Sequence, residues 1–148
     1  MPNDPVPGDG TRAYVLEDQV GHLLRRASQR HIALFSELFA DTGLTALQFA
    51  VIMKLQEHGE LSQNRLGRLT AMDPNTVQGV VKRLQKRELI ERRPNPADRR
   101  RIILALSPAG AALAIRLVDK GFQISDDTLS PLSPREAEAF LALLRRLT

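Results

Sequence analysis

The segment that begins at Ser62 contains two helix starts separated by a short break. Ser62 can cap a helix over residues 63–70. Asp73-Pro74 then marks a second start, because aspartate is a favoured N-cap residue and proline fits the first position of a helix. A short helix, a tight turn and a second helix to about residue 87 form a helix-turn-helix. This motif constrains the fold more closely than any other part of the chain.

Amphipathic helices are predicted on both sides of this motif. Residues 12–40 contain no proline and only one glycine, and their apolar residues recur at helical spacing. Three capping patterns predict the other helices, namely Thr45 with Gln48, Ser107-Pro108 for a long helix to about residues 123–127, and Ser133-Pro134 with Glu136. The side chains expected to face the core are Leu47, Val51, Ile52 and Leu55; Leu66 and Leu69; Leu113, Leu117 and either Phe122 or Ile124; and Ala137, Phe140, Leu141 and Leu144.

Two β-prone runs, residues 89–93 and 101–106, flank a polar turn and predict a β-hairpin. Pro94 lies near its tip, where a missing N–H group disturbs the ladder least. The expected fold is mainly α with a small β-hairpin wing. It comprises a disordered lead-in at 1–11, a winged helix-turn-helix at 45–106 and helical dimerisation segments at 12–44 and 107–148. We expect a homodimer, because the outer helices are more apolar than so small a core can bury.

The residue types exclude several classes of protein. Without cysteine, the chain can form no disulfide scaffold, thiolate zinc site or cysteine nucleophile. The three histidines form no His-x-x-x-His pair, and no Ser/His/Asp set, phosphate-binding glycine loop or paired carboxylates stand out. We therefore expect no metal, no cofactor and no enzymatic activity. The lack of a long apolar run and of a signal peptide predicts a cytoplasmic protein without a membrane partner.

Positive charge is concentrated in one part of the chain. Residues 62–101 contain eleven basic and four acidic residues, a net charge of +7, whereas the remainder carries −3. A basic centre in an acidic remainder predicts a polyanionic partner, most simply nucleic acid. Proteins that read single-stranded RNA usually stack bases on aromatic rings, and this segment has no Phe, Tyr or Trp. Double-stranded DNA is therefore the favoured partner.

The second helix of the motif has two distinct faces. At about 100° per residue, one face carries Val77, Val80, Val81 and Leu84. The opposite face carries Asn75, Gln78, Gly79, Lys82, Arg83 and Lys86, with Thr76 at its edge. Asn and Gln can bond adenine edges, Thr can contact a thymine methyl group, and Arg or Lys can reach guanine or phosphate. The alternative is a solvated face whose last-turn cations complement the helix dipole.

Gly79 is an unusual residue to find in the middle of a helix. Glycine lowers helix propensity by roughly 1 kcal/mol relative to alanine. Its lack of a side chain removes bulk from the middle of the face. A close approach of this face to another surface would explain its presence.

The hairpin carries a specific resemblance to a known family. Asn-Pro-Ala-Asp-Arg-Arg-Arg at 95–101 and Leu-Ala-Leu-Ser-Pro-Ala-Gly at 104–110 resemble the wing signature of the MarR family of bacterial transcriptional regulators. That signature is Asp-x-x-Asp-Arg-Arg followed by Leu-x-Leu-Thr-x-x-Gly, and here Asn95 replaces the first aspartate and Ser107 the threonine. Residues 61–67 are similar to the family's Leu-(Ser/Thr)-x-x-x-Leu-Ala motif, and Leu-Ile-Glu-Arg at 89–92 matches its Leu-(Ile/Val)-x-Arg motif. The likeness covers about residues 16–147.

The resemblance implies a homodimer with intertwined terminal helices and a recognition helix in the major groove. It also implies that a wing arginine, Arg99 or Arg100, enters the neighbouring minor groove, and that Asp98 holds the wing through a salt bridge to a nearby arginine. A narrow minor groove does attract a guanidinium group. The alternative is a merely solvated basic turn. The expected DNA contacts are Ser62, Gln63, Asn64, Arg65, Asn75, Thr76, Gln78, Gly79, Lys82, Arg83, Lys86, Arg92, Asp98, Arg99 and Arg100.

The resemblance also implies a small-molecule effector, since family members commonly release DNA on binding aromatic acids, phenols or their thioesters. On the first helix, His22, Arg26 and Gln29 share one face, and with His31 they are the candidate residues for holding a carboxylate. Residues 21–35 are similar to family members associated with breakdown of aromatic acids, including hydroxylated pyridine carboxylates. The lack of cysteine excludes the thiol-based peroxide-sensing branch. Alternatively, these polar residues lie at the surface or between subunits.

The leading hypothesis is a homodimeric repressor that binds a pseudo-palindromic operator and is released by a small aromatic acid. Its half-sites would lie about one helical turn apart. The alternative is a winged-helix DNA binder or protein-interaction module that does not respond to a small molecule.

Overall fold

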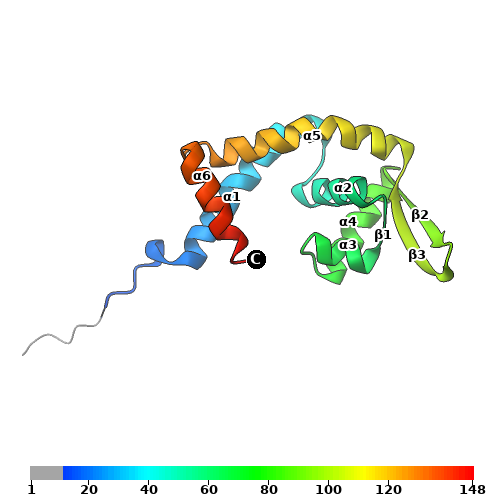
Figure 1. Ribbon diagram of the computed structural model, residues 1–148, viewed down its shortest axis with the longest axis horizontal. Helices are drawn as coiled ribbons and strands as arrows, with labels where there is room; N and C mark the ends of the chain where they lie inside the picture. Colours follow the sequence, from blue (N-terminus) through cyan, green and yellow to red (C-terminus); the bar gives the residue numbers. More distant parts are fainter. Residues whose placement is uncertain (1–11) are drawn as a thin grey trace, which may run out of the picture.

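The computed structural model describes residues 12–148, and the lead-in expected at residues 1–11 lies outside that range. Helix α5 runs along one side of the molecule, with the helix-turn-helix and the wing below one half of it and α1 and α6 below the other (Figure 1). Within the described range, no helix is long and apolar enough to cross a membrane. The elements are η1 (Leu16–Asp18), α1 (Val20–Leu38), η2 (Ala40–Thr42), α2 (Ala46–His58), β1 (Glu60–Ser62), α3 (Gln63–Leu69), α4 (Pro74–Lys86), β2 (Ile90–Asn95), β3 (Asp98–Leu106), α5 (Pro108–Leu129) and α6 (Pro134–Arg145), where η marks a 3₁₀ helix. The expected fold class, mainly α with a small β wing, is confirmed.

Each helix start that was predicted from a capping residue is confirmed. The side chain of the N-cap accepts a hydrogen bond from the backbone N–H three residues further on at Thr45, Ser62, Asp73, Ser107 and Ser133. Gln48 and Glu136 complete the two capping boxes by accepting from the N-cap backbone N–H. These starts depend on local chemistry alone, which is why the sequence predicts them.

The strands form an antiparallel sheet in the order β1-β3-β2. The expected hairpin is present, with Pro94 opposite Ile102 and a register shift between Pro94 and Asn95 next to the turn. Strand β1 was not expected. It pairs Leu61 with Leu104 on the other side of β3, and its three residues are too few to show the alternation that identifies a strand.

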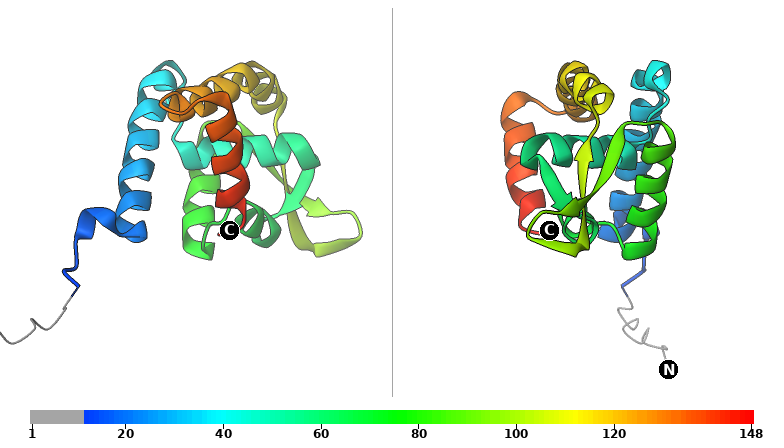
Figure 2. Two further views of the ribbon diagram at one scale, coloured as in Figure 1. Left: turned by 60° about the vertical axis from the view of Figure 1, so that its left-hand side comes forward. Right: turned by 90° about the vertical axis from the view of Figure 1, so that its right-hand side faces the viewer.

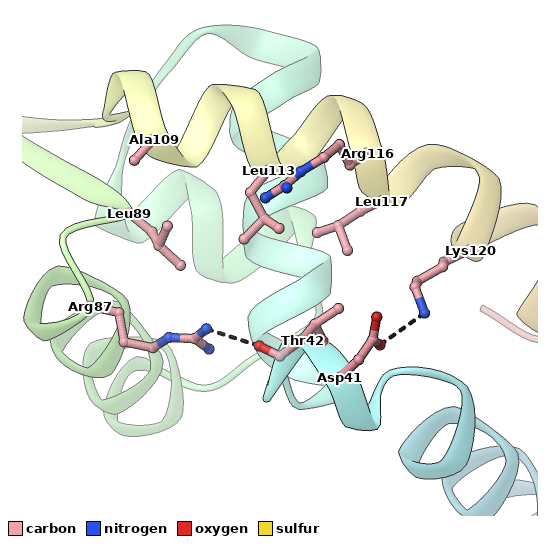
Figure 3. Close-up of a pocket in the computed structure, with 9 residues that line it drawn as sticks. All are labelled: Asp41, Thr42, Arg87, Leu89, Ala109, Leu113, Arg116, Leu117 and Lys120. Carbon is pink, nitrogen blue, oxygen red and sulfur yellow. Dashed lines mark hydrogen bonds and ion pairs between the residues drawn. The ribbon is translucent and has the colours of Figure 1, made fainter.

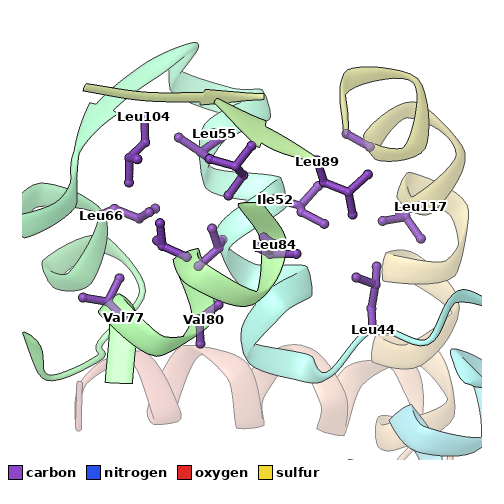
Figure 4. Packing of buried hydrophobic residues seen from close by; sticks show 14 of the residues in the cluster. Leu44, Ile52, Leu55, Leu66, Val77, Val80, Leu84, Leu89, Leu104 and Leu117 are labelled. Carbon is purple, nitrogen blue, oxygen red and sulfur yellow. The ribbon is translucent and has the colours of Figure 1, made fainter. Parts of the chain in front are cut away.

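The core lies where α2, α3 and α4 pack beneath the sheet and against the first half of α5 (Figure 4). Helix α4 contributes Val77, Val80, Val81 and Leu84, all buried as its periodicity predicts. Its partners include Ile52 of α2, Leu66 of α3 and Leu104 of β3. Because such interiors are closely packed, this contact fixes the rotation of α4 about its axis and therefore which side chains it presents to solvent.

Several predicted core positions need correction. Leu47 is 44% exposed and Leu69 is 37% exposed, whereas Gln48 is buried by its role in the capping box. Of the two alternatives in α5, Ile124 is buried and Phe122 is 70% exposed. Periodicity identifies the apolar side of a helix but not how much of that side a single chain covers.

The first helix begins later than predicted. It starts at Val20 rather than near residue 12, and a 3₁₀ turn with an extended Gln19 precedes it. The side chain of Gln19 donates a hydrogen bond to the carbonyl oxygen of Val15 at 2.8 Å, which stabilises this break. The start could not be read from the sequence, since Gln19 is the N-cap of α1 and its side chain makes no capping hydrogen bond.

The last helix also differs from expectation in its burial. None of the side chains of α6 is buried, so the predicted burial of Ala137, Phe140, Leu141 and Leu144 is wrong within one chain. Phe140 is 41% exposed, although the helix is strongly amphipathic in sequence. An apolar face of this kind needs a surface that the described chain does not supply.

Candidate DNA-binding surface

Helix α4 presents the predicted polar face to solvent. Its exposed side chains are Asn75, Gln78, Lys82, Arg83 and Lys86, with Thr76 and Gly79 half-buried between them. The face combines amide groups near the N-terminus with three cations toward the C-terminus. The opposite, apolar face is in the core, so packing determines the orientation of the polar one.

The start of α4 is held by Asp73 and Thr76. One carboxylate oxygen of Asp73 accepts from the Thr76 backbone N–H at 2.9 Å, and the other accepts from the Thr76 hydroxyl. The Thr76 hydroxyl, followed by its backbone N–H, lowers the pKa of Asp73. The hydroxyl proton of Thr76 is therefore used within the protein, which leaves its methyl group as the part able to meet a base.

Gly79 is not required by the packing of the protein itself. A Cβ atom at this position would meet only the Arg83 guanidinium, at an ordinary contact distance of 3.7 Å. Gly67 of α3 is different, because a Cβ atom there would lie 3.2 Å from the Met72 carbonyl oxygen and 3.3 Å from a methyl group of Val77. The close approach of α3 to α4 thus explains Gly67, whereas no contact within the described part of the chain requires a glycine at position 79.

The turn and the first helix of the motif adjoin this face. Ser62 caps α3, its hydroxyl oxygen accepting from the Arg65 N–H at 3.2 Å. Ser62, Asn64 and Arg65 are exposed, and Gln63 is half-buried. Ala71 in the turn has a positive φ of 54°, a strained value for alanine that the sequence does not reveal.

The arginines of the wing fall into two groups. Arg93 of β2 donates to Glu91 at 2.7 Å and to Glu60 of β1 at 3.4 Å, and Glu91 raises the pKa of Arg93. Both acidic residues lie opposite Ala105 of the central strand, so Arg93 bridges the sheet from one edge to the other. In contrast, the side chains of Arg92, Arg99 and Arg100 make no hydrogen bond or ion pair with residues 12–148.

The tip of the wing is shaped by bonds from side chains to the backbone. Asn95 accepts from the Ala97 N–H at 3.0 Å, and Asp98 accepts from the Arg100 N–H at 3.0 Å. The arginine nearest to the Asp98 carboxylate is Arg101, at 3.8 Å. Asp98 therefore organises the turn mainly through the backbone of Arg100, with a weaker ion pair to Arg101.

The four candidate effector residues on α1 do not converge within one chain. His31 lines an open groove of about 410 Å³ between α1, α5 and α6, whose walls include Leu24, Phe140 and Leu144. His22 lies nine positions earlier, which places it on the opposite side of the helix together with Arg26 and Gln29. The buried Nδ1 atom of His22 has no hydrogen-bond partner among residues 12–148.

Two arginines outside the predicted set have structural roles that link distant segments. Arg30 donates to the carbonyl oxygens of Asp127 and Thr128 at the end of α5. Arg87, directly after α4, donates to the carbonyl oxygen of Thr42 at 2.9 Å. Both bonds join residues far apart in sequence, so no local pattern could have predicted them.

Comparison with known proteins agrees with this geometry. The MarR family profile matches residues 42–101, which span α2 to the wing. The HTH-type transcriptional repressor NicR of Pseudomonas putida is 43% identical over 96% of this chain and 89% of its own length.

Two solved structures are also similar over nearly the whole chain. One is a probable transcriptional regulator from Pseudomonas aeruginosa, with 46% identity, a TM-score of 0.86, and coverage of 90% of this chain and 100% of that one. The other is Bordetella bronchiseptica BpsR, described with the mechanism by which 6-hydroxynicotinic acid regulates its DNA binding. It shares 42% identity and a TM-score of 0.87 over 92% of this chain and 97% of its own. With its helix-turn-helix, its arginine-rich wing and these relatives, the chain belongs to the MarR family of transcriptional regulators.

Proposed function

We propose that this regulator is a homodimeric repressor that binds a pseudo-palindromic operator and releases it on binding a hydroxylated pyridine carboxylate. The observation that carries the DNA-binding part is the exposed polar face of α4 beside a wing whose Arg92, Arg99 and Arg100 side chains have no bonding partner among residues 12–148. The repressor role is supported by the likeness to NicR, and the effector class by the likeness to BpsR.

On the operator, α4 enters the major groove, which is wide enough for a helix. Asn75 and Gln78 meet base edges, and Lys82, Arg83 and Lys86 reach guanine or phosphate. Gly79 lets the middle of the helix approach the base pairs closely. The N-terminus of α3, with Ser62, Gln63, Asn64 and Arg65, contacts the phosphate backbone and positions the reading helix.

The wing supplies the second contact. Arg99 or Arg100 enters the minor groove next to the major-groove site, and Arg92 contacts phosphate at the base of the wing. Arg93 does not take part, because Glu60 and Glu91 already neutralise it. Arg93 can therefore serve as a control in binding experiments, because it lies close in sequence to Arg92, Arg99 and Arg100 but is not expected to contact DNA.

A salt titration of operator binding tests this assignment. The purified dimer and a selected operator would be followed by fluorescence anisotropy from low to moderate salt. Arg99→Gln, Arg100→Gln or Lys82→Gln should weaken binding, and each lost phosphate contact should lower the salt dependence by about 0.9 in the log–log slope. Arg93→Gln is the matched control and should leave the slope unchanged. Equal slopes for all four variants and the wild type would overturn the proposed DNA-binding surface.

The effector is proposed to bind in the groove between α1, α5 and α6. The Thr128 hydroxyl donates its only proton to the Ile124 carbonyl oxygen at 2.7 Å, so His31 Nδ1 must donate to Thr128 at 2.8 Å. In the neutral ring, Nε2 is then an acceptor that can receive the hydroxyl group of the acid. The apolar walls suit an aromatic ring, and Ser28 and Ser125 offer further polar contacts.

Thermal-shift measurements with 6-hydroxynicotinic acid, followed by operator-release assays, test the effector proposal. The acid should stabilise the wild type and release the operator, and His31→Ala should lose both responses while it still binds DNA. His58→Ala is the control, because His58 ends α2 and does not line this groove. If the acid neither stabilises the protein nor releases DNA, the chain is a DNA binder without this response.

A further inference from the structure

The winged helix-turn-helix joins the outer helices at two places in the chain. One is the η2 turn (residues 39–45) between α1 and α2, coloured cyan in Figure 2, and the other is Ser107 between β3 and α5. The η2 turn lies beside the middle of α5, where Asp41 meets Lys120. Bonds across this turn therefore help to fix the angle between the winged helix-turn-helix and the outer helices.

Lys120 of α5 holds the η2 turn from one side (Figure 3). Its ammonium group donates to the Leu38 carbonyl oxygen at 2.7 Å and to the Asp41 carboxylate at 2.9 Å. It also lies 5.7 Å from the centre of the Phe39 ring, within the range of a cation–π contact. The hydrogen bond from Lys120 lowers the pKa of Asp41, as expected for a direct ion pair. One side chain of α5 thus binds the end of α1 and η2 together.

Arg87 holds the same turn from the other side. It is the C-cap residue of the recognition helix α4, and its guanidinium group donates to the carbonyl oxygens of Thr42 at 2.9 Å and Gly43 at 3.3 Å. Figure 3 shows Arg87 and Lys120 reaching η2 from different helices. The end of the recognition helix is therefore bonded to the η2 turn, and the η2 turn is bonded to α5.

Aromatic rings fill the space beside these bonds. The Phe39 ring stacks on Phe35 of α1 at 3.9 Å between centroids and meets Phe49 of α2 edge-on at 5.0 Å. A Cβ atom at Gly121 of α5 would lie only 3.0 Å from the Phe49 ring. Such packing resists separation of α1, α2 and α5, but hydrophobic contact is largely non-directional. The hydrogen bonds of the two cations have defined distances and angles, so they are the contacts that limit rotation.

We propose that Arg87 and Lys120 are positioning residues that set the half-site spacing which the dimer accepts. The inference rests on the proposed binding of a homodimer to an inverted repeat. In a dimer with two-fold symmetry, tilting α4 relative to α5 moves both recognition helices and changes the distance between them. One inserted base pair separates the half-sites by about 3.4 Å more and rotates one against the other by about 34°. A fixed angle restricts the dimer to one spacing, whereas a loosened angle tolerates several.

Operators of altered spacing test this role. Fluorescence anisotropy would compare the full-length protein on its selected operator and on versions with one base pair inserted or removed between the half-sites. The wild type should prefer the selected spacing by about tenfold, because it reaches misplaced half-sites only by deforming the DNA. In Lys120→Ala and in Arg87→Ala, the preference should fall to about threefold or less, since the protein adjusts instead.

Three further comparisons separate positioning from a general loss of structure or charge. Lys120→Arg keeps a cation at this place and should retain the spacing preference. Lys54→Ala is the matched control, because it removes the same charge from a lysine that pairs with Glu57 on its own helix at 2.6 Å. Affinity for a single half-site, measured at low salt, should be equal in Lys120→Ala and Lys54→Ala, since neither residue belongs to the proposed DNA-reading surface.

A measurement without DNA tests the angle itself. The chain has no cysteine, so Gln56→Cys on the exposed side of α2 introduces a single site for a spin label. Pulsed electron paramagnetic resonance then gives the distance between the two labels of the dimer. With Lys120 and Arg87 intact, the distance distribution should be narrow. Lys120→Ala or Arg87→Ala should broaden it, and Lys54→Ala should not.

Two results would overturn the proposal. One is a spacing preference that is the same in the wild type, Lys120→Ala and Arg87→Ala. The other is a label distance distribution that neither variant broadens. If the wild type selects no inverted repeat, the operator-binding function fails, and the label distances alone then decide whether Arg87 and Lys120 position the recognition helix.

Discussion

At the scale of single residues, Gly79 is a position where protein stability and DNA binding are expected to favour different residues. Among residues 12–148, a Cβ atom at this position would meet only the Arg83 side chain, at an ordinary contact distance. Gly79→Ala should therefore raise the free energy of unfolding by about 0.5–1 kcal/mol through helix propensity, yet weaken operator binding by obstructing close approach. Urea unfolding and operator titration on the same preparation measure both effects. Operator affinity equal to that of the wild type would show that the glycine does not serve DNA contact.

The lowered pKa of Asp73 predicts that the stability of the protein depends on pH. Because its pKa is lowered in the folded protein, its contribution to stability is fully present above the ordinary carboxylate pKa of about 4 and is lost as the pH falls through the lowered value. Asp73→Asn retains a capping residue that does not titrate. The wild type should be more stable than this variant at neutral pH, and the difference should shrink below about pH 4. Urea unfolding at several pH values measures it; a difference that stays constant down to pH 3 would contradict the capping account.

Only some residues of the candidate site could be predicted from the sequence. The outward face of α4 follows from a helical wheel and one capping residue, so the sequence alone predicts the exposure of Asn75, Gln78 and Lys82. The wing arginines could not be sorted in this way. Arg93 differs from Arg92 because its guanidinium group binds two carboxylates, Glu91 two residues earlier at 2.7 Å and Glu60 at 3.4 Å. Glu60 lies 33 residues earlier and comes near only through a strand pairing that no local pattern predicts.

At the scale of secondary-structure elements, the start of α5 packs closely against Glu88 and Leu89, which follow α4. Ser107 caps α5 and its hydroxyl also donates to the Glu88 carbonyl oxygen at 2.6 Å. Gly110 follows, and a Cβ atom there would overlap the Leu89 carbonyl oxygen. This overlap gives a physical reason for the glycine in the Leu-x-Leu-Ser-x-x-Gly segment.

Gly110→Ala should therefore destabilise the protein by about 1–3 kcal/mol, since the backbone must shift to make room. Thermal unfolding followed by circular dichroism would show the lower Tm. Gly21→Ala is the matched control, because a Cβ atom at residue 21 meets nothing within 4 Å, and it should be neutral or slightly stabilising. If both variants melt with the wild type, the junction is less tightly packed than described.

The elements that the sequence predicts well are the helices that begin with an N-cap side chain. All five capped helices begin where a Ser, Thr or Asp precedes the apolar pattern. Helix α1 lacks such a start and begins later than its periodicity predicts. The sequence does not predict β1, because pairing with β3, and not its own three residues, makes it a strand. Tertiary pairing is the information that a single sequence does not display.

At the scale of the whole molecule, the outer helices leave apolar side chains uncovered. Phe122 of α5 is 70% exposed, Leu143 of α6 is 57% exposed, and Val20 of α1 is also exposed. Such faces belong to the segments expected to dimerise, and their cover is proposed to be a second copy of the chain. The same proposal would account for the wrong burial predictions in α6, whose apolar residues would then face the second copy instead of the core of their own chain.

Phe122→Glu combined with Leu143→Glu should therefore shift the protein from dimer to monomer. The fold of each chain should persist, because neither side chain belongs to the buried core. Operator affinity should fall with loss of the dimer, since one recognition helix reads only a half-site. Sedimentation at micromolar concentration measures the oligomeric state, with Glu138→Gln on the same helix as the control. A double variant that remains dimeric would place the interface elsewhere.

We infer that two recognition helices, held by one dimer, read two half-sites of double-stranded DNA. Selection of bound sequences from a random DNA library by the purified full-length protein measures this arrangement. We expect an enriched inverted repeat whose half-sites lie about 10 base pairs apart, centre to centre. Enrichment of a single, unrepeated site, or of no sequence at all, would contradict it.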